Sequence, residues 1–256
     1  MSIHPVARSF AGVADVYEQA RPGFPAEAIV HLAGRLGLRP GRRVLDLAAG
    51  TGKLTRELVG TGAEVVAVEP RAEMREQLRA TSPGVEVHEG VAEAIPLPDG
   101  AVDAVTVAHA FHWFDRDRAY PEIARVLAPR PDAGLALVWN TRDQSDPLQA
   151  RLEALVKPHR DRAATREWEL EYDHPVRRAF FGEWEEWRRP WAQEFDRRLL
   201  RDRFHSVSYV ALMDPVERAA LLDELVAAAD DLGLPERFPF PYVTEVFVCF
   251  RQTDPE

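Results

Sequence analysis

The sequence predicts an α/β fold with a doubly wound, mainly parallel sheet of seven strands and a helical, aromatic-rich cap. Between about 41 and 140, short β-branched runs alternate with helical patterns, which is typical of βαβ units. Runs such as VVAV and VTVA lack polar alternation, so they fit strands buried on both faces. A chain of 256 residues is long enough to bury one such core.

The order of the elements follows from these patterns. An amphipathic helix over 26–36 ends at Gly37 and turns into the first strand. Strands are predicted over 43–47, 63–69, 85–88, 102–108 and 135–139, then around 192–195 and over 242–251. Further helices are predicted over 51–60, 71–80, 148–157 and 216–232.

Composition excludes several classes of protein. The net charge is −10, and the arginines between 158 and 203 alternate with acidic residues, which argues against a nucleic-acid partner. No apolar run reaches the ~20 residues that span a bilayer, so we expect no membrane partner and a cytoplasmic location. Cys249 is the only cysteine and lies in the apolar run VFVCF, which indicates a buried structural thiol.

The main functional motif is VLDLAAGTG over 44–52. A strand ends at Asp46, and a turn of small residues opens a helix, where backbone N–H groups and the helix dipole can meet a ligand. Glu69 ends the next strand, 23 residues after Asp46, and its carboxylate can accept hydrogen bonds from both ribose hydroxyls. Together these features predict a nucleoside-like ligand. The alternative is an ordinary βαβ turn with a solvated glutamate.

The turn also discriminates between nucleosides. A nicotinamide-binding turn reads G-x-G-x-x-G, but here Ala48 replaces the first glycine and Leu54 comes two residues after Gly52. Asp46 is an unfavourable neighbour for a pyrophosphate and a favourable one for a ligand with cationic groups. S-adenosylmethionine carries an ammonium and a sulfonium, so the turn favours this methyl donor over NAD.

The motifs around this turn resemble those of class I S-adenosylmethionine-dependent methyltransferases, and most those of the type 11 group that includes trans-aconitate methyltransferase-like enzymes. The resemblance is strong over about 40–145 and covers Gly90–Pro96, the run from Ala108 to Phe114, and Gly134–Asn140. It implies S-adenosylmethionine as cofactor. The residues that it assigns to the donor are Asp46, Ala48, Gly50, Gly52, Glu69, Pro70, Met74, Ala92, Glu93 and Ala108. Within this set, Glu69 would hold the ribose, Met74 would pack on adenine, and Ala92 and Glu93 would lie beside it.

Two further elements resemble those of the family. Tyr17 and Arg21-Pro22 match an N-terminal element that closes over the methionine end of the donor, where Arg21 would pair with its carboxylate. A surface arginine before a turn is an equally good interpretation of Arg21. His112 and Trp113 follow the fourth strand, so His112 is the candidate base and Trp113 a candidate wall of the methyl pocket. A structural histidine is the alternative for His112, and we expect no metal from the i,i+3 pair of His109 and His112.

Candidate residues for the acceptor are less specific. Asn140, Arg142 and Asp143 follow the fifth strand, although Asp143 is equally suited to cap the next helix. The Arg177-Arg178 pair suits an acidic acceptor but is more typical of a solvated helix face. The tryptophans of the cap can line an apolar pocket or form ordinary core: Trp168, Trp184, Trp187 and Trp191.

We therefore expect one domain over 1–256. It comprises a helical lid (1–40), a donor-binding core (41–145), a cap with helices (146–240) and a final strand (241–252). The predicted function is transfer of a methyl group to a small molecule, at oxygen by analogy with the family. The alternatives are an NAD(P)-dependent oxidoreductase, a donor-binding protein without activity, and a methyltransferase for protein or nucleic acid. The sequence leaves the oligomeric state open.

Overall fold

The computed structural model describes residues 21–162 and 174–252. These residues divide into two compact units. We call 23–140, 174–189 and 244–252 the sheet unit, and 21–22, 141–162 and 190–243 the helical unit. No helix in these described ranges is long and apolar enough to cross a membrane.

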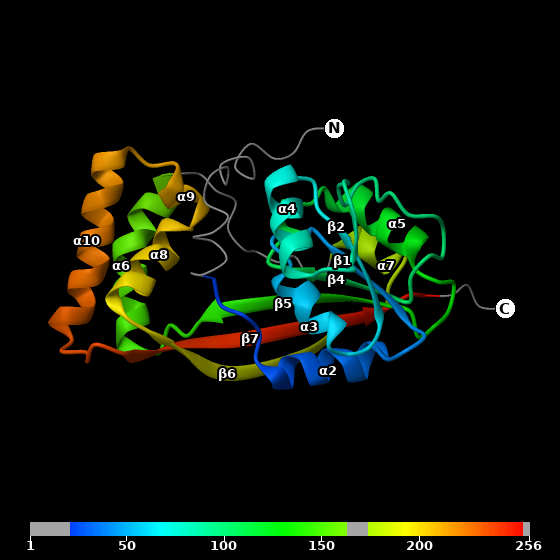
Figure 1. The fold of residues 1–256 in the computed structure, drawn as a ribbon, viewed down its shortest axis with the longest axis horizontal. Coiled ribbons are helices and arrows are strands. Elements are labelled where there is room, and N and C mark those ends of the chain that lie inside the picture. Colours follow the sequence, from blue (N-terminus) through cyan, green and yellow to red (C-terminus); the bar gives the residue numbers. More distant parts are fainter. Residues whose placement is uncertain (1–20, 163–173, 253–256) are drawn as a thin grey trace. The chain divides into compact units, whose positions relative to one another are not determined.

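Seven strands form one sheet in the order β3-β2-β1-β4-β5-β7-β6 (Figure 1). The strands are Arg43–Leu47 (β1), Glu64–Val68 (β2), Glu86–His88 (β3), Ala104–Ala108 (β4), Gly134–Arg142 (β5), Glu185–Phe195 (β6) and Phe238–Phe250 (β7). Strands β1 to β5 pair in parallel. Strand β7 runs antiparallel to β5, because Arg251 N donates to Ala133 O while Thr244 bonds to Asn140. The predicted mainly parallel, seven-stranded sheet is confirmed.

The helices of the sheet unit follow the predicted βαβ pattern, and the structure adds short helices that the sequence analysis did not predict. The helices of this unit are Ala26–Leu36 (α2), Lys53–Val59 (α3), Ala72–Thr81 (α4), Arg116–Val126 (α5), Pro175–Arg178 (α7) and the 3-10 turn Phe111–Trp113 (η2). The predicted helices over 26–36, 51–60 and 71–80 are therefore confirmed to within three residues at each end.

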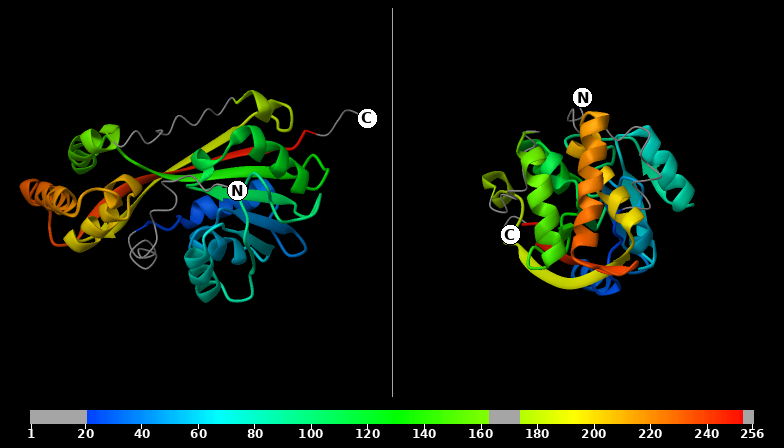
Figure 2. Two further views of the ribbon diagram at one scale, coloured as in Figure 1. Left: turned by 90° about the horizontal axis from the view of Figure 1, so that it is seen from above. Right: turned by 90° about the vertical axis from the view of Figure 1, so that its left-hand side faces the viewer.

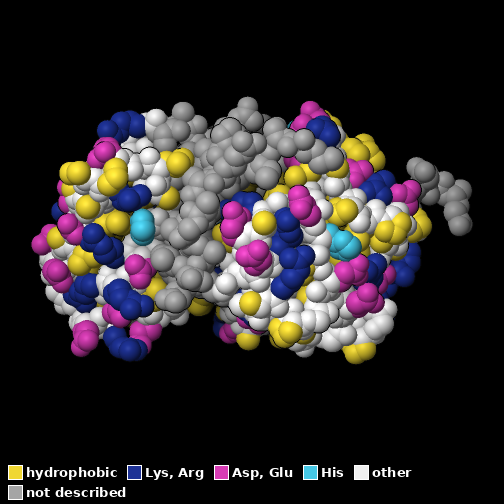
Figure 3. Space-filling view, turned by 45° about the horizontal axis from the view of Figure 1, so that its top comes forward, with side chains coloured by type: hydrophobic (Ala, Val, Ile, Leu, Met, Phe, Trp, Pro, Cys, Tyr) yellow, Lys and Arg dark blue, Asp and Glu magenta, His cyan; other side chains and the backbone are white. Residues whose placement is uncertain are grey.

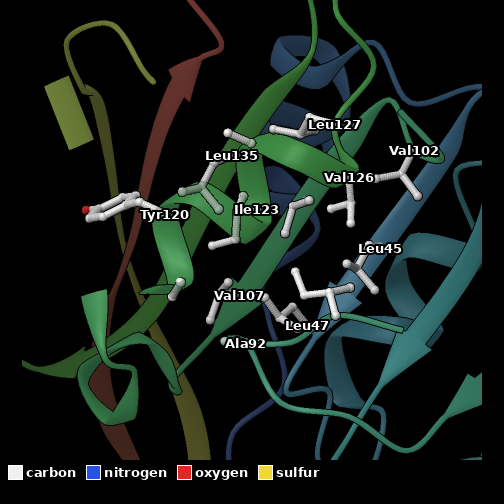
Figure 4. Packing of buried hydrophobic residues seen from close by; sticks show 14 of the residues in the cluster. Leu45, Leu47, Ala92, Val102, Val107, Tyr120, Ile123, Val126, Leu127 and Leu135 are labelled. Atoms are coloured by element: carbon white, nitrogen blue, oxygen red, sulfur yellow. The ribbon is translucent and has the colours of Figure 1, made fainter. Parts of the chain in front are cut away.

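Successive side chains of each central strand point to opposite faces of the sheet. Leu45 and Val107 pack in a cluster with Ile123 of α5 (Figure 4). Val44 packs in a second cluster on the opposite face, together with Leu32 of α2 and with residues of α3. Figure 2 shows α5 on one side of the strands and α2 on the other. Since a strand alternates its side chains, burial on both faces explains why these runs are almost wholly apolar.

The helical unit has its own core. Its helices are Pro147–Arg162 (α6), Arg197–His205 (α8), Ser208–Ala211 (α9) and Pro215–Asp231 (α10). Leu152, Phe204 and Leu225 of these helices pack with Phe240 and Tyr242 at the start of β7. Helices α6, α8 and α10 lie side by side in the right-hand view of Figure 2. The predicted helices over 148–157 and 216–232 and the two late strands are confirmed, and β6 is longer than predicted.

Charged side chains of both signs are interspersed over the face seen in Figure 3.

Cys249 is buried in the sheet core, and burial raises the pKa of its thiol. The prediction of a buried structural thiol is confirmed.

Candidate active site

The turn after β1 has an unusual backbone. Ala48, Gly50 and Gly52 all take positive φ angles, of 57°, 59° and 85°. The left-handed region is strained for alanine, and such strain is typical of functional turns. The turn is held by hydrogen bonds from Ala49 N to Val68 O (3.2 Å) and from Gly52 N to Ala49 O (3.0 Å). It therefore joins the ends of β1 and β2 before α3 begins.

The two glycines of this turn have different surroundings. A Cβ atom on Gly52 would lie 3.0 Å from Leu78 Cγ and 3.4 Å from Ser82 Oγ. A Cβ atom on Gly50 would meet nothing within 4 Å. Gly52 is thus required by packing inside the protein, whereas Gly50 borders open space where a ligand can approach the backbone.

Glu69 lies at the end of β2, and its side chain is bound to the turn. Its Oε2 accepts a hydrogen bond from Gly50 N (3.0 Å), and its Oε1 accepts from Arg71 N (3.1 Å) and Arg71 Nε (3.3 Å). Only 3% of Glu69 is exposed. Because an ionised carboxylate has about four acceptor sites, Glu69 retains capacity for a further donor. This orientation by Gly50 and Arg71 was not predicted from the sequence.

Asp46 is buried at the end of β1, with only 1% exposed. Thr55 Oγ1 donates to its Oδ2 (2.6 Å), and Thr106 Oγ1 lies 3.4 Å from its Oδ1. Burial raises the pKa of Asp46 to about 7, the two threonine hydroxyls oppose this rise, and the charge of Glu69 adds to it. The site thus contains a carboxyl group that titrates near neutral pH.

This titration predicts a pH dependence of stability. Between the ordinary aspartate pKa of 3.8 and the folded value of about 7, folded Asp46 holds a proton that the unfolded chain releases. The contribution of Asp46 to stability therefore falls as pH rises through this window. In urea unfolding, we expect the wild type to lose stability relative to Asp46→Asn up to pH about 7. Parallel pH profiles for the two proteins would contradict this expectation.

The segment after Glu69 reaches α4. Pro70 is half-buried, and Met74 lies on α4 with 1% exposed. Arg75 Nη1 donates to Glu69 O (3.0 Å), and Arg75 Nη2 bonds to Glu89 Oε2 (2.7 Å). A guanidinium therefore fixes the backbone of Glu69, a role that the sequence did not reveal.

The loop over Gly90–Pro96 folds back on itself. A Cβ atom on Gly90 would lie 2.6 Å from Pro96 Cδ, which explains the glycine. Ala92 is buried in the same cluster as α5. Glu93 Oε1 accepts a hydrogen bond from Asp115 N (2.8 Å), two residues after Trp113. This bond links the loop to the segment that follows β4.

The end of β4 carries a second strained residue. His109 follows Ala108, has φ 53°, and its Nε2 accepts a hydrogen bond from Asn140 N (3.1 Å). His112 lies on η2, with its ring 4.4 Å from the Trp113 ring and 5.4 Å from the Trp139 ring. Since parallel strands align their carboxyl ends, the ends of β1, β2 and β4 lie at one edge of the sheet. The structure thus brings the β4 candidates to the same edge as Asp46 and Glu69.

Three further candidate site residues either lie outside the described residues or form hydrogen bonds with other parts of the chain. Tyr17 lies outside the described residues. Arg21 belongs to the helical unit, where its Nη2 donates to Ser206 O (2.9 Å). Asn140 Oδ1 accepts from Thr244 Oγ1 (2.6 Å), and its Nδ2 donates to Gly23 O (2.8 Å). Both polar atoms of the Asn140 amide therefore form structural hydrogen bonds within the protein.

Asp143 does not cap the following helix. Its Oδ1 accepts from Ser145 N and Oγ, while Asp146 Oδ1 accepts from Gln149 N in the first turn of α6. Arg177 is only 1% exposed and donates to the carbonyl oxygens of Phe181 and Gly182, so it is not part of a solvated helix face.

The tryptophans of the predicted cap are divided among separate cores. Trp184 packs against the cluster that contains α5, Trp187 against the cluster that contains α2, and Trp191 stacks on Tyr242 in the helical unit. Trp168 lies outside the described residues. The described tryptophans of the predicted cap therefore do not form one aromatic pocket, because each of them packs against a different cluster.

Comparison with known proteins decides the family. Residues 45–131 match a family model described as a methyltransferase domain. An uncharacterized methyltransferase of Mycobacterium bovis is 41% identical over 253 residues, covering 96% of this chain and 95% of the relative. The chain belongs to the class I S-adenosylmethionine-dependent methyltransferases. The methyltransferase is therefore an enzyme whose cofactor is S-adenosylmethionine.

Solved structures and a functionally named relative extend this comparison. The methyltransferase shares its fold with a protein of Anaeromyxobacter dehalogenans that is described as a putative type II methyltransferase, with a TM-score of 0.66, 25% identity and coverage of 90% of this chain and 97% of that one. A demethylmenaquinone methyltransferase of Thermus thermophilus is 45% identical over 95 residues, which cover 34% of this chain and 43% of the relative. The trans-aconitate-like subgroup is not established by these similarities.

Proposed function

We propose that this methyltransferase acts on a small-molecule acceptor and that it methylates an oxygen atom. The observation that supports the donor half of the proposal is the hydrogen bond from Gly50 N to Glu69 Oε2, beside the open space at Gly50, whereas the small-molecule acceptor and the oxygen atom rest on the resemblance to the family. This bond orients a strand-end carboxylate next to a strained turn at a helix N-terminus. Such an arrangement suits the ribose and the cationic groups of S-adenosylmethionine and does not suit a pyrophosphate.

The residues present fit this donor. Glu69 has acceptor capacity for a ribose hydroxyl, and the ionised form of Asp46 is a favourable neighbour for the positive charge of the donor. The proposed donor-binding set comprises Asp46, Ala48, Gly50, Gly52, Glu69, Pro70, Met74, Ala92, Glu93, Ala108, Tyr17 and Arg21. We retain the cytoplasm as the predicted location.

The chemistry required of the protein is mainly positioning. S-adenosylmethionine supplies an activated methyl group on a sulfonium sulfur. The protein residues must align an acceptor atom and, for a hydroxyl acceptor, remove its proton. We assign His112 as the base and Trp113 as a wall that orients the acceptor. The Trp113 and Trp139 rings next to His112 restrict where its imidazole can turn.

A His112→Gln variant tests the assigned base. We expect kcat to fall ~10²–10⁴-fold, because general-base catalysis contributes about that factor. The Kd for the donor, measured by calorimetry, should stay within about threefold, since no donor contact is assigned to His112. His31→Gln on α2, whose ring stacks on Trp187, is the matched control and should leave kcat unchanged. An unchanged kcat in His112→Gln would show that His112 is not the base.

The acceptor is identified by a screen. The full-length protein is incubated with S-adenosylmethionine labelled in the methyl group and with a library of small metabolites, and products are located by mass spectrometry and NMR. We expect a methylated oxygen. Labelling of carbon, as the name of the Thermus relative suggests, would correct the atom but keep the small-molecule class. Labelling only of protein or nucleic acid would refute that class.

A further inference from the structure

The helical unit contains a cluster of arginine side chains around one glutamate. Arg142 at the end of β5 pairs with Glu153 Oε2 (2.6 Å), and Arg160 of α6 pairs with Glu153 Oε1 (2.5 Å). Arg203 of α8 acts electrostatically on Arg142 and on Tyr209. These side chains come from different elements, so the fold itself assembles the cluster.

Arg142 is the most enclosed member. Its guanidinium lies over the ring of Phe204, 5.3 Å from the ring centre, and its side chain is 18% exposed. Nη2 bonds to Glu153, while Nη1 is buried and finds no hydrogen-bond acceptor within 21–162 and 174–252. Burial lowers the pKa of Arg142, and the charge of Arg203 lowers it further.

Arg203 adds a positive charge without a carboxylate of its own. Its Nε lies 3.3 Å from Tyr242 Oη, and it has no ion pair within the described part of the chain. Burial raises the pKa of Tyr209, and the charges of Arg142, Arg160 and Arg203 oppose that rise. Glu153 is a carboxylate in this environment. Within the described residues, the charge of Arg203 is therefore not balanced by an ion pair of its own.

An unbalanced positive charge next to Arg142 is unfavourable inside a protein. A guanidinium stays protonated, and a partly buried charge that lacks a partner is destabilising. An anion would supply that partner, because two oxygens of a carboxylate or phosphate match the planar fork of arginine. The hydroxyls of Tyr209 and Tyr242 are further groups of this cluster that can donate to such a ligand.

We propose that Arg142, Arg160 and Arg203 form a binding site for the carboxylate or phosphate group of a small molecule. The site lies within the helical unit, whereas the strand-end residues assigned to the donor lie in the sheet unit. The proposal therefore does not depend on the methyl-transfer reaction and is tested by binding alone.

The experiment is calorimetry on the full-length protein at low ionic strength, with inorganic phosphate in one series and succinate in the other. We expect saturable binding of one anion per chain in at least one series. The preferred anion then shows which group the site takes. Arg203→Gln should weaken this binding ~10–100-fold, because hydrogen bonds to charged groups contribute about that much.

Matched variants make the test specific. Arg198→Gln lies on the same helix, changes the charge equally and alters a side chain that is 79% exposed, so it should bind like the wild type. If Arg203→Gln does not fold, Arg142→Lys keeps the charge but removes the fork and should weaken binding to a similar extent. Absence of saturable binding in both series, or equal losses in Arg198→Gln and the cluster variants, would overturn the proposal.

Discussion

Replacing Glu69 by glutamine is expected to weaken binding of S-adenosylmethionine by ~10–100-fold. A hydrogen bond from a ribose hydroxyl to a charged acceptor contributes about 1.5–3 kcal/mol, and the variant loses the charge. A carboxamide also offers one acceptor oxygen in place of two. Its NH2 group would face either the Gly50 N–H or the Arg71 N–H, which are both donors in the structure.

The measurement is the Kd for the donor by isothermal titration calorimetry, with Tm recorded in parallel to separate binding from folding. Glu64→Gln is the matched control. It removes the same charge from the other end of β2, where Glu64 is exposed and pairs with Arg43 (2.8 Å). We expect the control to bind the donor like the wild type. A Kd for Glu69→Gln within about threefold of wild type would refute the assignment of Glu69 to the ribose.

The second large effect separates the two glycines of the turn. In Gly50→Val, the side chain enters open space, and the left-handed backbone at φ 59° costs about 1–2 kcal/mol. In Gly52→Val, the same strain is combined with contacts to Leu78 and Ser82 that are already 3.0 and 3.4 Å from a Cβ atom. Overpacking of this kind adds about 1–3 kcal/mol.

We therefore expect the same substitution to affect mainly donor binding at Gly50 and mainly stability at Gly52. Gly50→Val should remain folded with a modest fall in Tm but lose donor binding, because its side chain occupies the space assigned to the ligand. Gly52→Val should show a much larger fall in Tm or fail to fold. Calorimetry and thermal unfolding of both variants provide the check. Normal donor affinity in Gly50→Val, or equal falls in Tm for the pair, would be inconsistent with this picture of the turn.

The sequence by itself determined the βαβ order, the boundaries of β1 to β4 to within two residues, and the positions of Asp46 and Glu69. Uninterrupted apolar runs identified the buried strands, and the turn after β1 predicted the edge of the sheet where the ligand binds. Parallel strands align their carboxyl ends. The positions where β1, β2 and β4 end were therefore sufficient to predict that Asp46, Glu69 and His112 lie at one edge of the sheet. These conclusions depend on periodicity and chain order, which are local properties.

Only the tertiary structure decided what each side chain bonds to. The hydrogen bond between Gly50 and Glu69, the threonines on Asp46, and the engagement of Asn140 by Thr244 join residues from separate elements. The arginine cluster around Glu153 was equally invisible in the sequence. Hydrogen-bond direction and burial depend on register and packing between distant segments, which local patterns do not encode. The sequence thus located the donor edge, whereas the fold revealed the anion site that we propose.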